Sequence, residues 1–297
     1  ESGGNYNVVV GDEAGTAIST GDRNAFVGYK AGDSTTTASY NTAMGSYALD
    51  ANTTGEKNVA FGDASLDANT SGSNNVAIGQ ASLTANTTAD DNTAVGYQSL
   101  AANTTGGNNI AVGKDALLTN TTANDNVAIG LQALKLNTTG ASNVAIGRDA
   151  LEANTTASNN TAVGKDALAA NTTGTAGTAM GKGALAANTT GTDNTGLGAL
   201  ALLGTTTGSN NVAVGRSALQ SNTTASNNTA VGYNSLIANT TGDTNTAIGK
   251  DSMKTNTTGT NNGAFGTRTL QLNTTGTSNV AVGDQALGAN TTADNNT

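Results

Sequence analysis

The side chains best able to do chemistry in this sequence are its 21 aspartates and glutamates, because it contains no histidine and no cysteine. That absence excludes the usual zinc sites and catalytic triads that use histidine. Paired carboxylates could still serve a glycosidase, but here the acids recur at variable positions and form no distinctive cluster. Those acids are Asp63, Asp115, Asp149, Asp166 and Asp251, and the Asp90–Asp91 pair falls at an expected solvated corner. We therefore predict that the protein is not an enzyme and holds no metal or cofactor.

Composition excludes several binding functions. The net charge is −9 with a pI near 4.3, and the 12 basic residues are scattered, so we expect no nucleic-acid partner. No apolar run is long enough for a membrane span, which predicts no membrane insertion of this segment. The Gly-Gly-x-Gly-x-Asp calcium repeat does not occur, and no glycine-rich phosphate loop is followed by Lys and Ser/Thr.

The tripeptide Asn-Thr-Thr recurs and matches the N-glycosylation sequon, for example at Asn52, Asn86 and Asn103. Corner geometry combined with stacked amides explains the same pattern, and we prefer that explanation. Synthesis through a eukaryotic secretory route would instead lead to modification of these sites.

The feature that organises the sequence is a glycine every 17 residues, from Gly11 to Gly283, without an insertion or deletion. A fixed period of this kind is typical of stacked repeats in which each repeat contacts its neighbours. A disordered polar tract would have no reason to keep a large apolar side chain at one phase of the period. Residues 58–74 serve below as the reference repeat, with Asn58 at position one and Gly62 at position five.

Each repeat predicts one short strand, because position two is usually β-branched, position three alanine and position four large and apolar. The glycine at position five then makes a turn, as expected for Gly62, Gly79, Gly96 and Gly113. Strand alternation places positions two and four on one side, and we expect that side to be the interior. The predicted core rows are position four (Phe61, Ile78, Val95 and Val112) and position nine (Leu66, Leu83, Leu100 and Leu117).

The segment between the glycine and position twelve is too short to be a helix by itself, so we favour a second strand or an extended turn over one helical turn. Positions twelve to fifteen read Asn-Thr-Thr-Gly or Asn-Thr-Thr-Ala and predict a corner. Asparagines at positions one and twelve should form amide ladders between stacked coils. These rows are Asn58, Asn75, Asn92 and Asn109, and Asn52, Asn69, Asn86 and Asn103.

Two leucine-sized side chains per repeat make a thin core, so a second burial surface is expected. The alanine row at position three (Ala60, Ala77, Ala94 and Ala111) could be a flat stripe between chains of a homotrimer. The alternative is that alanine simply fits a tight coil interior.

Residues 1–40 match the repeat poorly, since Gly15 and Gly32 stand where leucine belongs and the Asn-Thr-Thr corner is missing. We therefore divide the chain into divergent N-terminal coils, residues 1–40, and a regular array, residues 41–297. The last residues begin a new repeat, so we expect the array to continue beyond Thr297.

The strings Asn-Val-Ala-Ile-Gly at 75–79 and 143–147 resemble the repeated motif in head domains of YadA-type trimeric autotransporter adhesins. The longer pattern at 92–106 is similar to repeats of phage tail-fibre-like proteins. The resemblance implies a left-handed parallel β-roll, three chains to a rod, outside the cell. The adhesin coil is usually shorter than the 17-residue repeat of this chain, so the resemblance does not fix the handedness or the outline of the coil.

We thus expect an all-β parallel β-solenoid, trimeric, acting as the structural rod of an extracellular adhesive fibre on a cell surface or a virion tail. Its partners would be further copies of itself and a glycan or protein receptor, with Tyr29, Tyr97 and Tyr233 as exposed candidates for stacking on glycans. Two alternatives stay open: a filament that joins end to end, and an ice-binding solenoid that uses its threonine rows.

Overall fold

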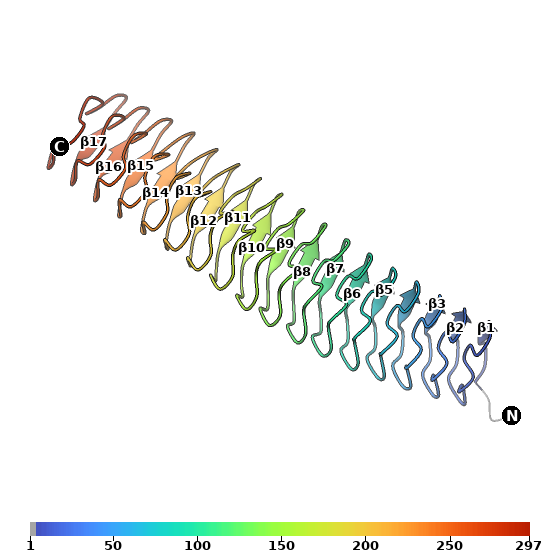
Figure 1. Cartoon of the computed structure of the whole chain (residues 1–297). Helices are drawn as coiled ribbons and strands as arrows, with labels where there is room; N and C mark the ends of the chain where they lie inside the picture. Colours follow the sequence, from blue (N-terminus) through green and yellow to red (C-terminus); the bar gives the residue numbers. More distant parts are fainter. Residues whose placement is uncertain (1–3) are drawn as a thin grey trace. The chain divides into compact units, whose positions relative to one another are not determined.

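The computed structural model describes residues 4–297 and divides into two compact units, the first ending at Arg148 and the second beginning at Asp149. Each unit is an all-β parallel solenoid, which confirms the expected fold class (Figure 1). Residues 4–40 keep the regular coil with β1 and β2, whereas residues 1–3 of the expected N-terminal segment lie outside the described residues.

Every strand is three residues long and occupies positions two to four of its repeat. The first unit contains β1 (Val8–Val10), β2 (Ala25–Val27), β3 (Thr42–Met44), β4 (Val59–Phe61), β5 (Val76–Ile78), β6 (Thr93–Val95), β7 (Ile110–Val112), β8 (Val127–Ile129) and β9 (Val144–Ile146). The second contains β10 (Thr161–Val163), β11 (Thr178–Met180), β12 (Thr195–Leu197), β13 (Val212–Val214), β14 (Thr229–Val231), β15 (Thr246–Ile248), β16 (Gly263–Phe265) and β17 (Val280–Val282).

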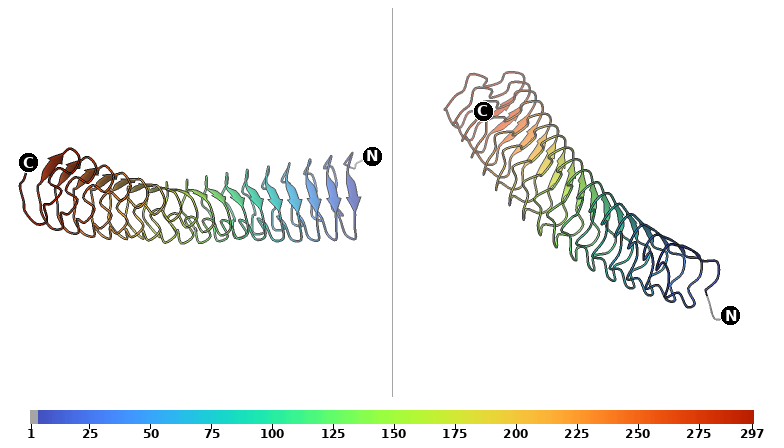
Figure 2. Two further views of the ribbon diagram at one scale, coloured as in Figure 1. Left: turned by 90° about the horizontal axis from the view of Figure 1, so that it is seen from above. Right: turned by 45° about the vertical axis from the view of Figure 1, so that its right-hand side comes forward.

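Within each unit, every strand pairs in parallel with the strand of the next coil, residue for residue. Val59 lies opposite Val76, and Phe61 lies opposite Ile78. In both views of Figure 2 the strands of a unit follow one another along one face of the coils. Since the repeat has no insertions, identical positions lie directly above one another.

The side of the strand that faces the interior is opposite to the sequence-based expectation. Ala60, Ala77, Ala94 and Ala111 are completely buried, whereas Phe61 and Ile78 are 48% and 39% exposed and Val95 and Val112 are half-buried. The prediction of position four as core was therefore wrong, and so was the alanine row as a stripe between chains. The alternative explanation of that row, a tight coil interior, is the one that the structure supports.

The interior is narrow because each regular coil fills it with one leucine and small or polar side chains: the position-three alanine, an alanine, serine or threonine at position eight, and asparagines. Leu66, Leu83, Leu100 and Leu117 at position nine are all fully buried. At Gly196, which replaces the position-three alanine, an added Cβ would lie 3.5 Å from Cδ1 of Leu185 in the preceding coil. An alanine methyl at this position therefore meets the leucine at van der Waals distance, and a valine or isoleucine would have no room.

The segment between the glycine and position twelve is a series of turns, so of the two expected forms, a second strand or an extended turn, the structure has the turn. Ala64 and Leu66 have φ angles of 50° and 53°, and the same left-handed angles recur at these two positions along the chain. The Ala64 N–H donates to Ser46 O in the preceding coil over 2.9 Å, and the Leu66 N–H donates to Ser82 O in the next coil over 3.0 Å. A left-handed leucine costs about 1–2 kcal/mol, which its burial and its hydrogen bond offset.

The recurring glycine is required for two reasons. Gly79 has a φ of 128°, a backbone conformation that residues other than glycine rarely adopt. A Cβ on Gly79 would also lie 2.6 Å from Gly96 O in the next coil. The close stacking of coils therefore explains why this position never varies.

The two asparagine rows lie inside the coil, and both include amide-to-amide contacts, which at position one occur in only some coils, as from Asn109 Nδ2 to Asn92 Oδ1 over 3.2 Å. At position twelve, Asn69 Nδ2 donates to Asn52 Oδ1 over 2.9 Å, which is an amide-to-amide ladder. At position one, it is the backbone N–H of Asn75 that donates to Asn58 Oδ1, also over 2.9 Å. Both rows also donate to the carbonyl at position fifteen: Asn58 and Asn69 each reach Gly72 O. Asparagine thus satisfies backbone groups that the corner leaves without strand partners.

A further row of polar contacts, which we did not predict, runs along position sixteen. The Glu56 N–H donates to Ser73 Oγ over 3.0 Å, and the Ser73 N–H donates to Asp90 Oδ1 over 2.7 Å. At position thirteen, the Thr53 hydroxyl donates to Thr70 O in the next coil over 2.9 Å. These contacts account for the Ser, Thr, Asn and Asp content of the corner.

The divergent N-terminal coils exchange large and small residues inside the core. Phe26 replaces the position-three alanine and is fully buried, while Gly15 and Gly32 replace the position-nine leucines on either side. A Cβ on Gly32 would lie 2.5 Å from the Phe26 ring, so the ring occupies the space of the missing leucine. The coil outline is preserved because the lost and gained volumes compensate.

Phe26→Ala should therefore destabilise the N-terminal coils by about 3–5 kcal/mol, as expected for a buried aromatic side chain. Gly32→Leu alone should also destabilise, because its side chain would overlap the Phe26 ring. The double variant restores the ordinary Ala/Leu pair and should recover most of the loss. Hydrogen exchange of the amides in residues 7–50 measures each effect, and additive losses in the double variant would contradict this account.

Asn86→Ala should destabilise the first unit by about 2–4 kcal/mol, because it leaves buried polar groups without partners. Asn86 Nδ2 donates to Asn69 Oδ1 over 2.8 Å, and Asn86 Oδ1 accepts from Asn103 Nδ2 over 3.2 Å. The exposed Thr88 in the same coil gives the control, since Thr88→Ala should stay within about 0.5 kcal/mol of the native chain. Equal losses on urea denaturation would show that the ladder carries no special stability.

Candidate self-association surface

No cavity or cleft occurs among residues 4–297, and the same residues contain no group of three acids that could hold a metal ion. The described part of the chain also has no helix that could cross a membrane.

The sequon asparagines are unsuited to carry a glycan in the folded chain. Asn52, Asn86 and Asn103 are completely buried, and their Nδ2 atoms, where a glycan would be attached, donate hydrogen bonds inside the coil. An attached sugar would displace these bonds and the neighbouring coil.

The threonine rows offer one column of free hydroxyls. Thr104 at position thirteen donates its hydroxyl to Thr121 O over 3.0 Å, whereas Thr105 at position fourteen is exposed. The pairs of adjacent threonines therefore present a single outward column, which lacks the paired columns of an ice-ordering face.

The surface with the clearest chemical character is the outward side of the strands. We define the strand stripe as the side chains at positions two and four of β1–β9 in the first unit, and likewise of β10–β17 in the second. Its exposed apolar members in the first unit are Val8, Val10, Met44, Phe61, Ile78, Ile110, Ile129 and Ile146. Those in the second unit are Met180, Val212, Ile248, Phe265, Val280 and Val282.

No charged residue interrupts the strand stripe in either unit, although the chain carries 12 basic and 21 acidic residues. Position two of the second unit is mostly threonine, as in Thr178 and Thr246, so the stripe is more apolar in the first unit. Continuous exposed apolar surface of this kind marks an interaction site on a protein.

Charged and aromatic side chains line the two margins of the strand stripe. Position six follows the glycine and carries exposed side chains such as Asp63, Lys114 and Lys165. Position seventeen precedes the next strand and carries exposed Arg23, Lys57 and Asp125. The stripe thus has the apolar centre and polar rim of a protein interface.

The tyrosines proposed for glycan contact lie on the position-six margin. Tyr29, Tyr97 and Tyr233 are 39%, 44% and 45% exposed. Lys30 Nζ lies 5.9 Å from the Tyr29 ring centre, and Lys114 Nζ lies 5.7 Å from that of Tyr97.

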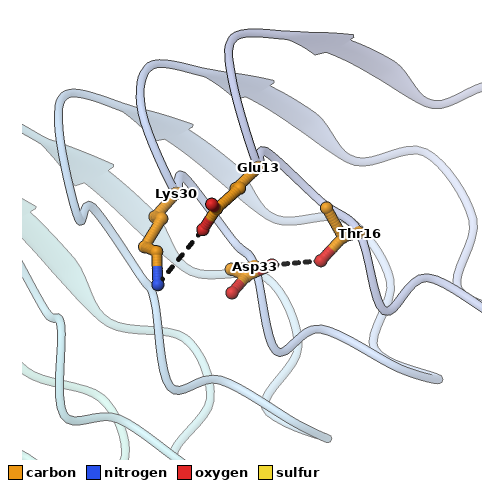
Figure 3. Close-up of polar contacts among 4 residues, drawn as sticks. All are labelled: Glu13, Thr16, Lys30 and Asp33. Atoms are coloured by element: carbon orange, nitrogen blue, oxygen red, sulfur yellow. Dashed lines mark hydrogen bonds and ion pairs between the residues drawn. The ribbon is translucent and has the colours of Figure 1, made fainter.

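The first coils also hold a polar cluster, which Figure 3 shows in close-up. Lys30 Nζ lies 3.2 Å from Glu13 Oε2, and this hydrogen bond raises the pKa of Lys30. In the same view Thr16 donates its hydroxyl to Asp33 Oδ1. Asp33, Asp50 and Asp67 all stand at position ten of successive coils. Partial burial raises the pKa of Asp50, and the Asp33 carboxylate raises it further.

Comparison with family models finds no match for this chain, and comparison with curated proteins finds none either. Function is therefore inferred from the strand stripe and the repeat that forms it.

Asp50→Asn should raise the melting temperature slightly at pH 7. The pKa of Asp50 in the folded state lies above its unfolded value of about 4, so ionisation of this carboxyl opposes folding. The free energy of unfolding therefore falls as the pH rises from the unfolded pKa through the folded pKa. The gain from Asn should shrink as the pH falls to about 4, since the native carboxyl is then protonated as well. Asp63→Asn, which neutralises an exposed acid in the next coil, is the control. Identical pH profiles for the two variants would contradict partial burial and the Asp33 carboxylate as the cause.

Proposed function

We propose that this chain is a non-catalytic structural segment, a shaft or head, of an extracellular adhesive fibre, and that copies of it associate through the strand stripe into a trimer. The observation that carries the proposal is the row of position-four side chains on the outward side of the strands, which is apolar in every strand of both units. A solenoid that only had to remain folded in water would place polar side chains there.

The thin interior gives the stripe an energetic role. Each regular coil buries a single large apolar side chain, with mostly alanine, serine and asparagine around it, whereas ordering a residue costs about 1–2 kcal/mol. Burial of the position-four side chains against a partner would add apolar area at about 25 cal/mol per Å² in every coil. Repetition makes the sum large even though the contribution of one coil is small.

The partner that fits best is another copy of the same chain. Coils stack at about 4.8 Å, and a complementary surface must present apolar groups with the same spacing. The strand stripe itself does so. Cyclic symmetry with three stripes turned toward one axis closes the assembly and leaves the corners and the variable positions in solvent.

The extracellular setting is inferred from the resemblance of the Asn-Val-Ala-Ile-Gly repeats to adhesin heads and of residues 92–106 to tail-fibre-like repeats. The exposed side chains outside the stripe would then meet a receptor, which could be a glycan or a protein. The coils would contribute length and stiffness.

The test is the mass of the chain in solution, native and with Ile78→Lys and Ile129→Lys combined. Both isoleucines are exposed in the isolated chain, so the fold should survive, but an ammonium buried without a partner costs several kcal/mol. We expect a threefold mass for the native chain and a monomer for the variant.

Thr88→Lys combined with Thr139→Lys is the matched control, because these exposed threonines lie on the corners of the same two coils. This control should remain trimeric. A native monomer would refute the proposal, and an open-ended size distribution would indicate the filament.

A further inference from the structure

Because the strand stripe repeats in every coil, it does not by itself determine the register of two copies along the coil axis. Sliding one copy by one coil, about 4.8 Å, again places Val, Ile or Thr against Val, Ile or Thr. A unique alignment therefore needs residues that do not repeat. Within the first unit such residues are concentrated beside β1–β3.

Four of the six tyrosines lie beside these three strands. Tyr6 and Tyr40 occupy position seventeen, before their strands, and Tyr29 and Tyr47 occupy positions six and seven, after theirs. All four are exposed. Only here does the strand stripe have aromatic side chains on both margins, so the apolar surface is wider than in the later coils of the unit.

These aromatic side chains are already held in place. Arg23 lies between Tyr6 and Tyr40, 5.4 Å from each ring centre, and its Nη1 donates to the Tyr40 hydroxyl over 3.1 Å. On the other margin, the rings of Tyr29 and Tyr47 meet edge to face at 5.3 Å. Preordered tyrosines and arginines lose little entropy on binding and dominate interface energetics.

The two margins also differ in charge. At position seventeen, Arg23 and Lys57 stand beside β2 and β4, and at position six, Asp12 and Asp63 stand beside β1 and β4. Asp22, next to Arg23, is engaged within the chain, because the Asn5 N–H donates to its Oδ1 over 2.6 Å.

The relative direction of two copies decides which margins meet. When the copies are parallel and related by an axis along the coils, the position-seventeen margin of one faces the position-six margin of the other. An antiparallel pair brings like margins together. In the parallel pair without offset, Arg23 is level with Tyr29, and Lys57 is level with Asp63. A shift by one coil breaks the Lys57–Asp63 pair, but in one direction it brings Arg23 level with Asp12. The charges alone therefore do not fix the register, and the contacts of Arg23 and the tyrosines have to do so.

We propose that the aromatic margins of β1–β3 fix the parallel direction and the register of the assembled chains. The partner is a second copy of this chain, which contacts the first through the same three coils. This inference rests on the proposed self-association through the strand stripe.

Distance measurements between spin labels test the proposal, because the chain has no cysteine of its own and each label site is unique. Copies with Thr54→Cys carry a nitroxide and co-assemble with copies with Thr139→Cys that carry a gadolinium label. Both threonines are exposed, outside the stripe and five coils apart. That axial offset makes the distance between unlike labels sensitive to a slip by one coil.

The native assembly should give one narrow distance between unlike labels. Nitroxides at position 54 alone and at position 139 alone should also give equal distances, as a parallel arrangement requires. The variant with Tyr6, Tyr29, Tyr40 and Tyr47 all changed to alanine should keep its threefold mass but give several distances, from slips of about 4.8 Å along the axis. Tyr97→Ala with Tyr233→Ala, which removes exposed tyrosines elsewhere, should leave the single distance unchanged.

Three results would overturn the inference while leaving self-association intact. They are a single narrow distance in the four-tyrosine variant, several registers or an antiparallel pattern in the native assembly, and a four-tyrosine variant that becomes monomeric. The last result would assign the tyrosines to affinity and not to register. A native chain that is itself monomeric would refute the proposed function and this inference together.

Discussion

The spacing between neighbouring coils, about 4.8 Å, is the constraint on which the other features of this protein depend. At this distance a Cβ on Gly79 would overlap the carbonyl of Gly96, so the position cannot vary. The same closeness lets one asparagine reach the next along the chain of coils. It also limits the interior of a regular 17-residue coil to one leucine, small side chains and two asparagines, so that the larger side chains of the strand point outward wherever the leucine is present.

Stacking of identical positions rewards some residue types and penalises others. Neutral amides that donate and accept can repeat indefinitely, as Asn52, Asn69 and Asn86 do in the interior. Carboxylates repeat less well: partial burial raises the pKa of Asp50, and the Asp33 carboxylate one coil away raises it further. Asp33, Asp50 and Asp67 nevertheless follow one another at position ten of successive coils.

The period, the strand at positions two to four, the buried leucine and the corner could be predicted from the sequence, because each depends on local residue preferences. Strand alternation correctly grouped positions two and four but could not say which side was inside. The threonines at position two, such as Thr42 and Thr93, were the available signal, since a hydroxyl row is better tolerated outside a narrow apolar core. The left-handed conformation of Leu66 had no signal, because leucine avoids it in isolation and adopts it only where stacked coils supply partners. The candidate interaction surface was missed for the same reason that the core was assigned to the wrong side.

Repetition and deviation from it have different consequences for this molecule. The repeated residues determine the fold and extend a uniform surface, but on a uniform surface one coil cannot be distinguished from the next. Only coils that depart from the repeat differ from their neighbours, and the departures in the core and on the surface occur in the same coils. The coils that exchange Ala and Leu for Phe26 and Gly32 in the core are the ones that carry Tyr6, Arg23, Tyr29 and Tyr40 outside. Since the core exchange preserves the coil outline, β2 still pairs with β3 in register, and the outer face of these coils can differ from the rest without interrupting the stack.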